Sequence, residues 1–127
     1  MRRVKMTGRD GFAVCIETPG GHSVLFDEPE ERGGTDTGPS PTGMLAAALA
    51  ACTVDTLKFY ADRKGWDLEG IEIAVETSYD GYRPSEYRVE LDLPDHLDTE
   101  QKERLRVIAG KCPVHRTLSD PIPVEIV

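Results

Sequence analysis

The sequence predicts an α+β fold with antiparallel sheets and two main helices. Two observations support this prediction: strand-like segments occur in runs of three and two, and each run is followed by a helical pattern. Strict alternation of strands and helices would indicate a parallel sheet instead. The length of 127 residues is usual for one domain with one packed core, so we expect a single domain over residues 1–127.

The N-terminal third has the pattern of a three-stranded antiparallel meander. Its strand-like segments are residues 2–7, 12–18 and 22–26, which are rich in β-branched and aromatic side chains. Residues 8–11 (GRDG) and 19–21 (PGG) separate them. Short links of Gly, Asp and Pro are typical of hairpin turns, so each strand should pair with the next.

A long central helix is predicted after an acidic loop at residues 27–41 that is rich in Gly and Pro. Ser40 is suited to the N-cap position and Pro41 to the first helical position. The helical pattern continues to about Lys64, and Gly65 is a natural residue at a helix C-terminus.

The C-terminal half begins with two strands, residues 70–79 and 86–93, whose apolar residues alternate with polar ones. Residues 81–85 are expected to join them as a hairpin. The apolar positions of the two strands are Ile71, Ile73, Val75, Tyr87, Val89, Leu91 and Leu93.

A second helix is predicted within residues 97–112, followed by a last strand at residues 122–127. Asp98 is a good N-cap, and Gln101 stands at the position that completes a capping box. Leu105, Ile108 and Ala109 share the apolar face of this helix.

Charge and hydropathy exclude several function classes. Fifteen basic against 23 acidic residues leave a net charge of -8, which disfavours contact with nucleic-acid phosphates. No uninterrupted apolar stretch reaches the roughly 18 residues that span a bilayer, and the charged N-terminus does not resemble a signal peptide. We therefore expect a cytoplasmic protein that binds neither nucleic acid nor membrane, and no motif calls for a cofactor.

The chain has three cysteines, Cys15, Cys52 and Cys112, an odd number that argues against a structural disulfide framework. Cys15 lies on a predicted strand and is interpreted as a structural bystander. Cys52 lies in an alanine-rich helix, where an isolated cysteine is most often a small buried apolar residue. Its expected helix face comprises Leu45, Ala48, Leu49, Cys52, Thr56 and Phe59.

Cys112 has a more distinctive setting. It precedes Pro113, so it can cap a new short helix whose first residue is that proline. Free backbone N–H groups at such a cap favour the thiolate, and Lys111 and Arg116 act in the same direction, so the pKa of Cys112 should be lowered. The alternative is a tight corner between two helices with no chemical role.

Three kinds of chemistry remain open for these thiols. Cys52, Cys112 and His115 could hold zinc, although no complete ligand pattern is present. A Cys–His pair could transfer acyl groups, although nothing marks an oxyanion hole. A redox pair is the hypothesis we favour, in which one thiol is oxidised to a sulfenic acid and the other resolves it as a disulfide.

Two motifs together resemble the OsmC/Ohr family, the osmotically inducible and organic hydroperoxide resistance proteins. They are GPSPTGMLAAALAAC at residues 38–52 and CPVHRTL at residues 112–118, and GPSP and CPV are usual in the OsmC-like branch. The resemblance implies a thiol-dependent peroxidase for organic hydroperoxides that uses a dithiol reductant. It also implies an intertwined homodimer whose central helices pack together, with Cys52 as the attacking thiol and Cys112 as the resolving thiol.

The resemblance also implies an active-site arginine, held by a glutamate just after the proline that starts the central helix. TGRDG at residues 7–11 resembles the family's arginine turn, which makes Arg9 the candidate and Arg32 the fallback. Thr42 and Gly43 stand where the glutamate is expected, so the holding carboxylate is missing. This departure favours a slow peroxidase. The alternatives are a small-molecule binding protein with little turnover and a metal-binding dimer.

Overall fold

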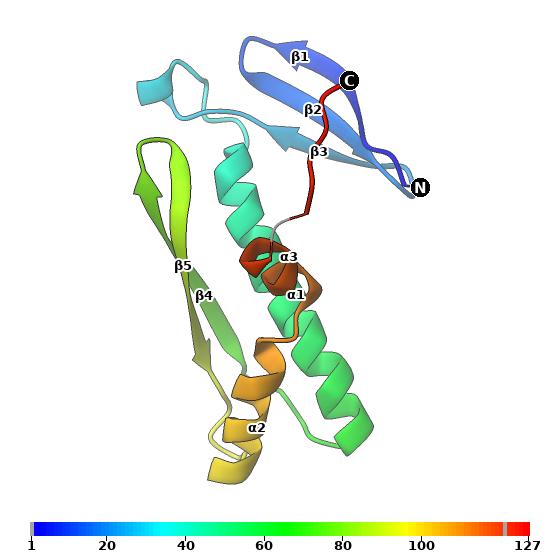
Figure 1. The fold of residues 1–127 in the computed structure, drawn as a ribbon, viewed down its shortest axis with the longest axis vertical. Coiled ribbons are helices and arrows are strands. Elements are labelled where there is room, and N and C mark those ends of the chain that lie inside the picture. The colour runs from blue at the N-terminus through cyan, green and yellow to red at the C-terminus, as the bar shows by residue number, and fades with distance from the viewer. Residues whose placement is uncertain (1, 121) are drawn as a thin grey trace. The chain divides into compact units, whose positions relative to one another are not determined.

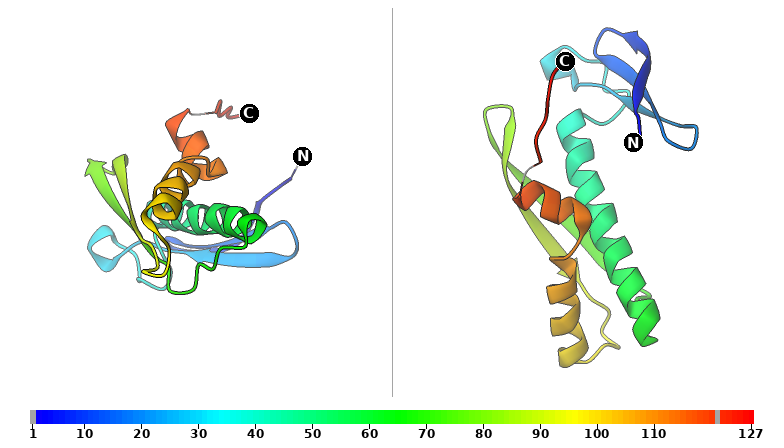
Figure 2. Two further views of the ribbon diagram at one scale, coloured as in Figure 1. Left: turned by 90° about the horizontal axis from the view of Figure 1, so that it is seen from below. Right: turned by 45° about the vertical axis from the view of Figure 1, so that its right-hand side comes forward.

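The structure, a computed structural model, describes residues 2–120 and 122–127. It contains two compact units, Met1–Leu45 and Ala46–Val127, which are treated separately below. The first holds a sheet and a loop. The second holds most of the long helix, a two-stranded hairpin and two further helices (Figures 1 and 2).

The N-terminal sheet is an antiparallel meander in the order β1-β2-β3, as predicted. The strands are β1 (Lys5–Asp10), β2 (Ala13–Thr18) and β3 (His22–Phe26). The first strand was placed too early in the sequence, because the turn is not residues 8–11 but the two residues Gly11 and Phe12. Gly11 has φ +61°, which suits a tight two-residue turn.

The acidic loop is ordered around Asp27, whose side chain is 2% exposed. Its carboxylate accepts hydrogen bonds from the hydroxyl and backbone N–H groups of both Thr35 and Thr37, and from the N–H of Glu28. The bonds from Thr35 and Thr37 outweigh the effect of burial and lower the pKa of Asp27. The loop also contains a short 3-10 helix, η1 (Glu30–Arg32).

The long helix α1 (Pro41–Lys64) begins and ends as predicted. Ser40 Oγ accepts a hydrogen bond from the N–H of Gly43 at 3.1 Å, and Gly65 has φ +71° after the last turn. On the predicted helix face of Cys52, Leu49 is buried, whereas Phe59 is 74% exposed. The buried residues of α1 are Leu49, Thr53, Leu57, Tyr60 and Ala61. Cys52 lies at the edge of this stripe and is partly exposed.

The length and composition of α1 are also those of a helix that could cross a membrane. The core helix of a soluble protein passes the same test. The helix carries Asp55 on its exposed side, and an acid at the centre of a bilayer is costly.

Strands β4 (Glu72–Asp80) and β5 (Arg83–Asp92) form an antiparallel hairpin. Their inward and outward residues alternate as predicted. The connection is shorter than expected, because the turn consists of Gly81 and Tyr82 and the second strand resumes at once. Gly81 has φ +62°, which a two-residue hairpin turn requires.

Helix α2 (Thr99–Ala109) packs its apolar face into the core of the second unit. The Asp98 carboxylate accepts from the N–H of Gln101, and the Gln101 side chain accepts from the N–H of Asp98, so the predicted capping box is confirmed. The core is formed by α1, α2 and the segments beside the hairpin, and comprises Leu57, Tyr60, Ala61, Leu68, Leu93, Leu97, Leu105, Ile108 and Ala109.

The chain continues into the short helix α3 (Pro113–Ser119). The predicted last strand at residues 122–127 is wrong for the residues described, which form no strand. Their alternation suits a strand, but no strand of the described chain pairs with them, and Pro123 lacks an N–H donor. Ile122, Val124 and Ile126 are accordingly 64%, 86% and 97% exposed.

Candidate thiol site

Helix α1 places Cys52 where its thiol is partly exposed. The residue lies three turns into the helix, next to the buried stripe rather than within it. Its carbonyl also accepts a hydrogen bond from the hydroxyl of Thr56 at 2.8 Å, which helps to hold this turn. A partly exposed thiol on a rigid helix is accessible to a small molecule.

Cys112 is the N-cap of α3, with Pro113 in the first turn, as predicted. Its sulfur accepts a hydrogen bond from the backbone N–H of His115 at 3.5 Å. The residue is 0% exposed, so it does not meet solvent directly. The proline therefore does more than form a corner, because it begins a helix whose free N–H groups face the thiol.

Cys52 and Cys112 are free thiols, and the fold brings them close enough for each to shift the pKa of the other. Burial raises the pKa of Cys52, and its hydrogen bond to Cys112 raises it further. Burial also raises the pKa of Cys112. Hydrogen bonds from the Cys52 thiol, the backbone N–H groups of His115 and Val114, and the Thr53 hydroxyl outweigh it, so the pKa of Cys112 is lowered.

These shifts agree with the expectation that Cys112 is the more acidic thiol, since it caps a helix. Exposure, in contrast, favours Cys52 as the thiol that meets a substrate first, because Cys112 is fully buried and Cys52 is not. The fold thus supplies one accessible thiol and, close to it, one buried thiol with a lowered pKa. Such a pair suits sequential oxidation and resolution.

Thr53 belongs to the site although sequence reasoning missed it. Its side chain is 1% exposed, and its hydroxyl donates to the carbonyl of Leu49 at 2.7 Å. The same hydroxyl can instead donate to the sulfur of Cys112 and lower its pKa. The one available signal in the sequence was a polar residue directly after the apolar run that ends at Cys52.

A cavity of about 290 Å³ lies beside the thiol pair. Thr53 and His115, which both contact Cys112, line it, together with Arg106 and the apolar Val89 and Leu91 of β5. Among the residues described, no three His, Cys, Asp or Glu side chains gather as metal ligands. The described residues therefore give no support to the alternative in which Cys52, Cys112 and His115 hold a metal.

The other predicted site residues lie in the first unit. Arg9 is on β1 opposite Val14 and donates from Nη1 to the carbonyl of Gly11 at 3.1 Å. Arg32 forms an ion pair with Glu28, with 3.5 Å between Nη1 and Oε2. Cys15 is on β2, in a different unit from the thiol pair. The role of either arginine toward the thiols stays a prediction.

The first turn of α1 has no carboxylate, as the sequence indicated. Gly43 has little room for one, because a Cβ atom there would lie 3.0 Å from Ser40 Oγ. That oxygen already accepts the N–H of Gly43 as the helix cap. A side chain at this position therefore requires Ser40 Oγ to shift by a few tenths of an ångström.

Comparison with known proteins gives a consistent result. A family model described as OsmC-like protein matches residues 34–127. An uncharacterized protein of Acinetobacter baylyi is 28% identical over 122 residues, which cover 93% of this chain and 84% of that protein.

Solved structures with the same fold include two from other bacteria. An OsmC-like protein from Mycoplasma pneumoniae has a TM-score of 0.79 at 19% identity, covering 95% of this chain and 89% of that one. An organic hydroperoxide resistance protein OsmC from Legionella pneumophila has a TM-score of 0.67 at 22% identity, covering 98% and 93%. At these identities the likeness establishes the fold.

Proposed function

Because the chain belongs to the OsmC-like protein family, we propose that it is a thiol-dependent peroxidase that reduces organic hydroperoxides with Cys52 and Cys112. The observation that carries the proposal is the proximity of two free thiols of different exposure, close enough for each to shift the pKa of the other. The Legionella relative with this fold is named an organic hydroperoxide resistance protein, which supports the substrate class.

In the first step, the thiolate of Cys52 attacks the terminal oxygen of the hydroperoxide ROOH. An S–O bond forms and the O–O bond breaks, so Cys52 becomes a sulfenic acid and the alkoxide leaves as the alcohol ROH after taking up a proton. Cys52 is assigned this step because its thiol is partly exposed, whereas Cys112 is 0% exposed.

In the second step, the Cys112 thiolate attacks the sulfur of the Cys52 sulfenic acid. The S–S bond forms, the S–O bond breaks, and the hydroxide leaves as water after taking up a proton. The lowered pKa of Cys112 suits this role, because it keeps the buried sulfur in its nucleophilic form. An external dithiol then reduces the disulfide by two exchange steps and is itself oxidised.

The first step is expected to be slow. Burial and the neighbouring Cys112 raise the pKa of Cys52, so little of its thiol is ionised near neutral pH. We propose that an arginine, Arg9 with Arg32 as the fallback, stabilises the Cys52 thiolate and the departing oxygen. Without a carboxylate at residues 42–43 that arginine is less well oriented, which favours low turnover.

The proposal includes an intertwined homodimer that acts in the cytoplasm. Support for the dimer comes from large apolar side chains that one chain leaves uncovered, such as Phe59 at 74% and Val107 at 55% exposure. The alanine-rich first half of α1 also leaves Ala47 and Ala51 exposed, and such small residues allow a second helix to approach closely. Reducing conditions in the cytoplasm would keep the thiols free between turnovers.

A second candidate function is a small-molecule binding protein of the same fold with little peroxidase turnover. The raised pKa of Cys52 and the missing carboxylate at Thr42 and Gly43 favour it. The two functions differ in stoichiometry, because only a peroxidase consumes many equivalents of hydroperoxide per chain.

The experiment is to follow cumene hydroperoxide consumption with dithiothreitol as the reductant. The wild type and Cys15→Ser should turn over repeatedly, whereas Cys52→Ser should not consume the hydroperoxide. In the absence of reductant, Cys112→Ser should consume one equivalent of hydroperoxide and stop at a sulfenic acid that dimedone traps. Consumption by Cys52→Ser together with none by Cys112→Ser would reverse the two roles. No consumption above the reductant alone in the wild type would favour the binding protein.

A further inference from the structure

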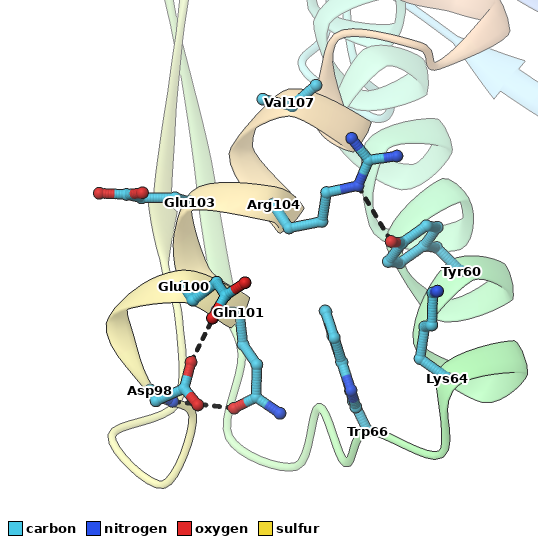
Figure 3. A pocket seen from close by; sticks show the side chains of 9 residues that line it. All are labelled: Tyr60, Lys64, Trp66, Asp98, Glu100, Gln101, Glu103, Arg104 and Val107. Atoms are coloured by element: carbon cyan, nitrogen blue, oxygen red, sulfur yellow. Dashed lines mark hydrogen bonds between the residues drawn. The ribbon is translucent and has the colours of Figure 1, made fainter.

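A cavity of about 590 Å³ lies away from the thiol pair, between the C-terminal end of α1 and helix α2 (Figure 3). It is bordered by Tyr60, which follows Cys52 by eight residues and therefore lies about 12 Å farther along the helix axis. Its volume is within the range of ligand pockets, roughly 300–1,000 Å³. The proposed peroxidase chemistry does not use it.

Two aromatic rings form one side of this cavity. The Tyr60 and Trp66 ring centroids are 5.6 Å apart with an interplanar angle of 69°, an edge-to-face contact. Tyr60 is 8% exposed, and Trp66 is partly buried against the core. In Figure 3 the indole lies between Lys64 and Gln101 with Arg104 beyond its end. A flat apolar surface of this kind suits a planar ring.

Three cations surround Tyr60 in a chain of net charge -8. The guanidinium carbons of Arg63 and Arg104 lie 5.7 and 5.5 Å from its ring centroid, and Lys64 Nζ lies 5.7 Å away. In the described part of the chain, none of the three forms an ion pair with a carboxylate. The cations therefore concentrate positive charge that acidic side chains do not neutralise at close range.

Arg104 is held in place and still has donors to offer. Its Nε donates to the Tyr60 hydroxyl at 3.0 Å, which leaves the N–H groups on both Nη atoms. That bond also outweighs burial and lowers the pKa of Tyr60, with the charges of Arg104, Lys64 and Arg63 acting in the same direction. A guanidinium fixed through one nitrogen can receive a carboxylate with the others.

The acidic side chains that line the cavity do not occupy the space next to the Nη groups of Arg104. The Asp98 carboxylate is engaged as the α2 cap with Gln101. Figure 3 shows Glu103 pointing away from Tyr60 and Trp66, and Glu100 lies near the Asp98 end. The part of the cavity next to Lys64 and Arg104 is therefore the part that favours an anion.

From these contacts we infer that the cavity binds a planar aromatic carboxylate, with its ring against Trp66 and its carboxylate between Arg104 and Lys64. Both halves of the ligand are needed. The ring supplies apolar area that a simple anion lacks, and the carboxylate supplies the charge that a neutral aromatic lacks.

The experiment uses the fact that Trp66 is the chain's single tryptophan, so the ¹⁵N-labelled protein has one indole N–H signal. Titration with 2-naphthoate should shift this signal saturably. The neutral 2-naphthalenemethanol and the small anion acetate should each shift it much less at equal concentration. Equal shifts from naphthoate and naphthalenemethanol, or a shift that does not saturate, would overturn the inference.

Substitutions of the two cations test whether their charges contribute to naphthoate binding. Arg104→Gln and Lys64→Gln should each weaken naphthoate binding by about tenfold, which corresponds to about 1.4 kcal/mol. The matched control is Arg106→Gln, on the same helix but outside this cavity, which should bind as the wild type does. Cys52→Ser should also bind normally, since the site is independent of the thiols. Unchanged affinity in both Arg104→Gln and Lys64→Gln would refute the site.

Discussion

Oxidation of the thiol pair should raise the stability of the folded chain by a large and calculable amount. The perturbation is one equivalent of cumene hydroperoxide per chain, which the proposed mechanism converts into a disulfide between Cys52 and Cys112. Because the two thiols already lie close enough for each to shift the pKa of the other, closing the bond should require little rearrangement of the fold.

The magnitude follows from the length of chain that the disulfide closes. Cys52 and Cys112 enclose a loop of about 60 residues, and closing such a loop in the unfolded chain stabilises the folded state by about 4 kcal/mol. For a chain of this length, that free energy corresponds to a rise of about 15 °C in melting temperature. A strained disulfide would give less, and an unrelated modification would give almost nothing.

The assay is thermal unfolding followed by circular dichroism, at one protein concentration, before and after oxidation. Cys15→Ser should show the full rise, and Cys112→Ser should show none. A rise smaller than about 3 °C in the wild type would refute the contact geometry. So would a full rise in Cys112→Ser, because the stabilising bond would then involve another cysteine.

Three further predictions concern residues around the site and in the loop. Thr53→Val should raise the pKa of Cys112, since it removes a hydrogen-bond donor, whereas Thr53→Ser should keep that pKa low. The pH dependence of thiolate absorbance in a Cys52→Ser background measures the pKa of Cys112, and the same value in both variants would contradict the prediction. Asp27→Asn should destabilise the protein at neutral pH. Because the pKa of Asp27 is lowered on folding, the stability difference between wild type and variant should be complete above about pH 4 and shrink as the pH falls through the pKa of the folded state. Urea unfolding of both forms across this pH range measures the difference, and a constant difference would contradict the prediction. Gly43→Ala should lower the melting temperature despite the better helix propensity of alanine, because the added Cβ atom would lie close to Ser40 Oγ. A higher melting temperature would show that the Ser40 side chain shifts at little cost.

Features set by local chemistry could be predicted from the sequence. Ser40 and Pro41 start α1, and Asp98 with Gln101 caps α2, because each signal depends on backbone groups within four residues. The same holds for Cys112 as a helix cap, because that role depends on the proline that follows it, whereas its lowered pKa also depends on the distant Cys52.

Features that depend on distant partners could not be predicted. The buried face of α1 depends on where the rest of the core packs against it. Helix spacing placed Leu49 and Phe59 on one face but could not show that Leu49 is buried and Phe59 exposed. Alternation at residues 122–127 indicated a strand, but a strand also needs a pairing edge, which sequence periodicity does not reveal. Thr53 was missed because a buried hydroxyl becomes informative once its neighbour Cys112 is known.

The central claim is that Cys52 and Cys112 form one redox pair, and peptide mapping by mass spectrometry tests it most directly. The reduced protein receives one equivalent of cumene hydroperoxide, remaining thiols are alkylated at low pH, and the digest is analysed without reduction. We predict one dominant linked peptide joining Cys52 to Cys112, with Cys15 alkylated. A sulfenic or sulfinic acid on Cys52 beside an alkylated Cys112, or a linkage through Cys15, would contradict the account.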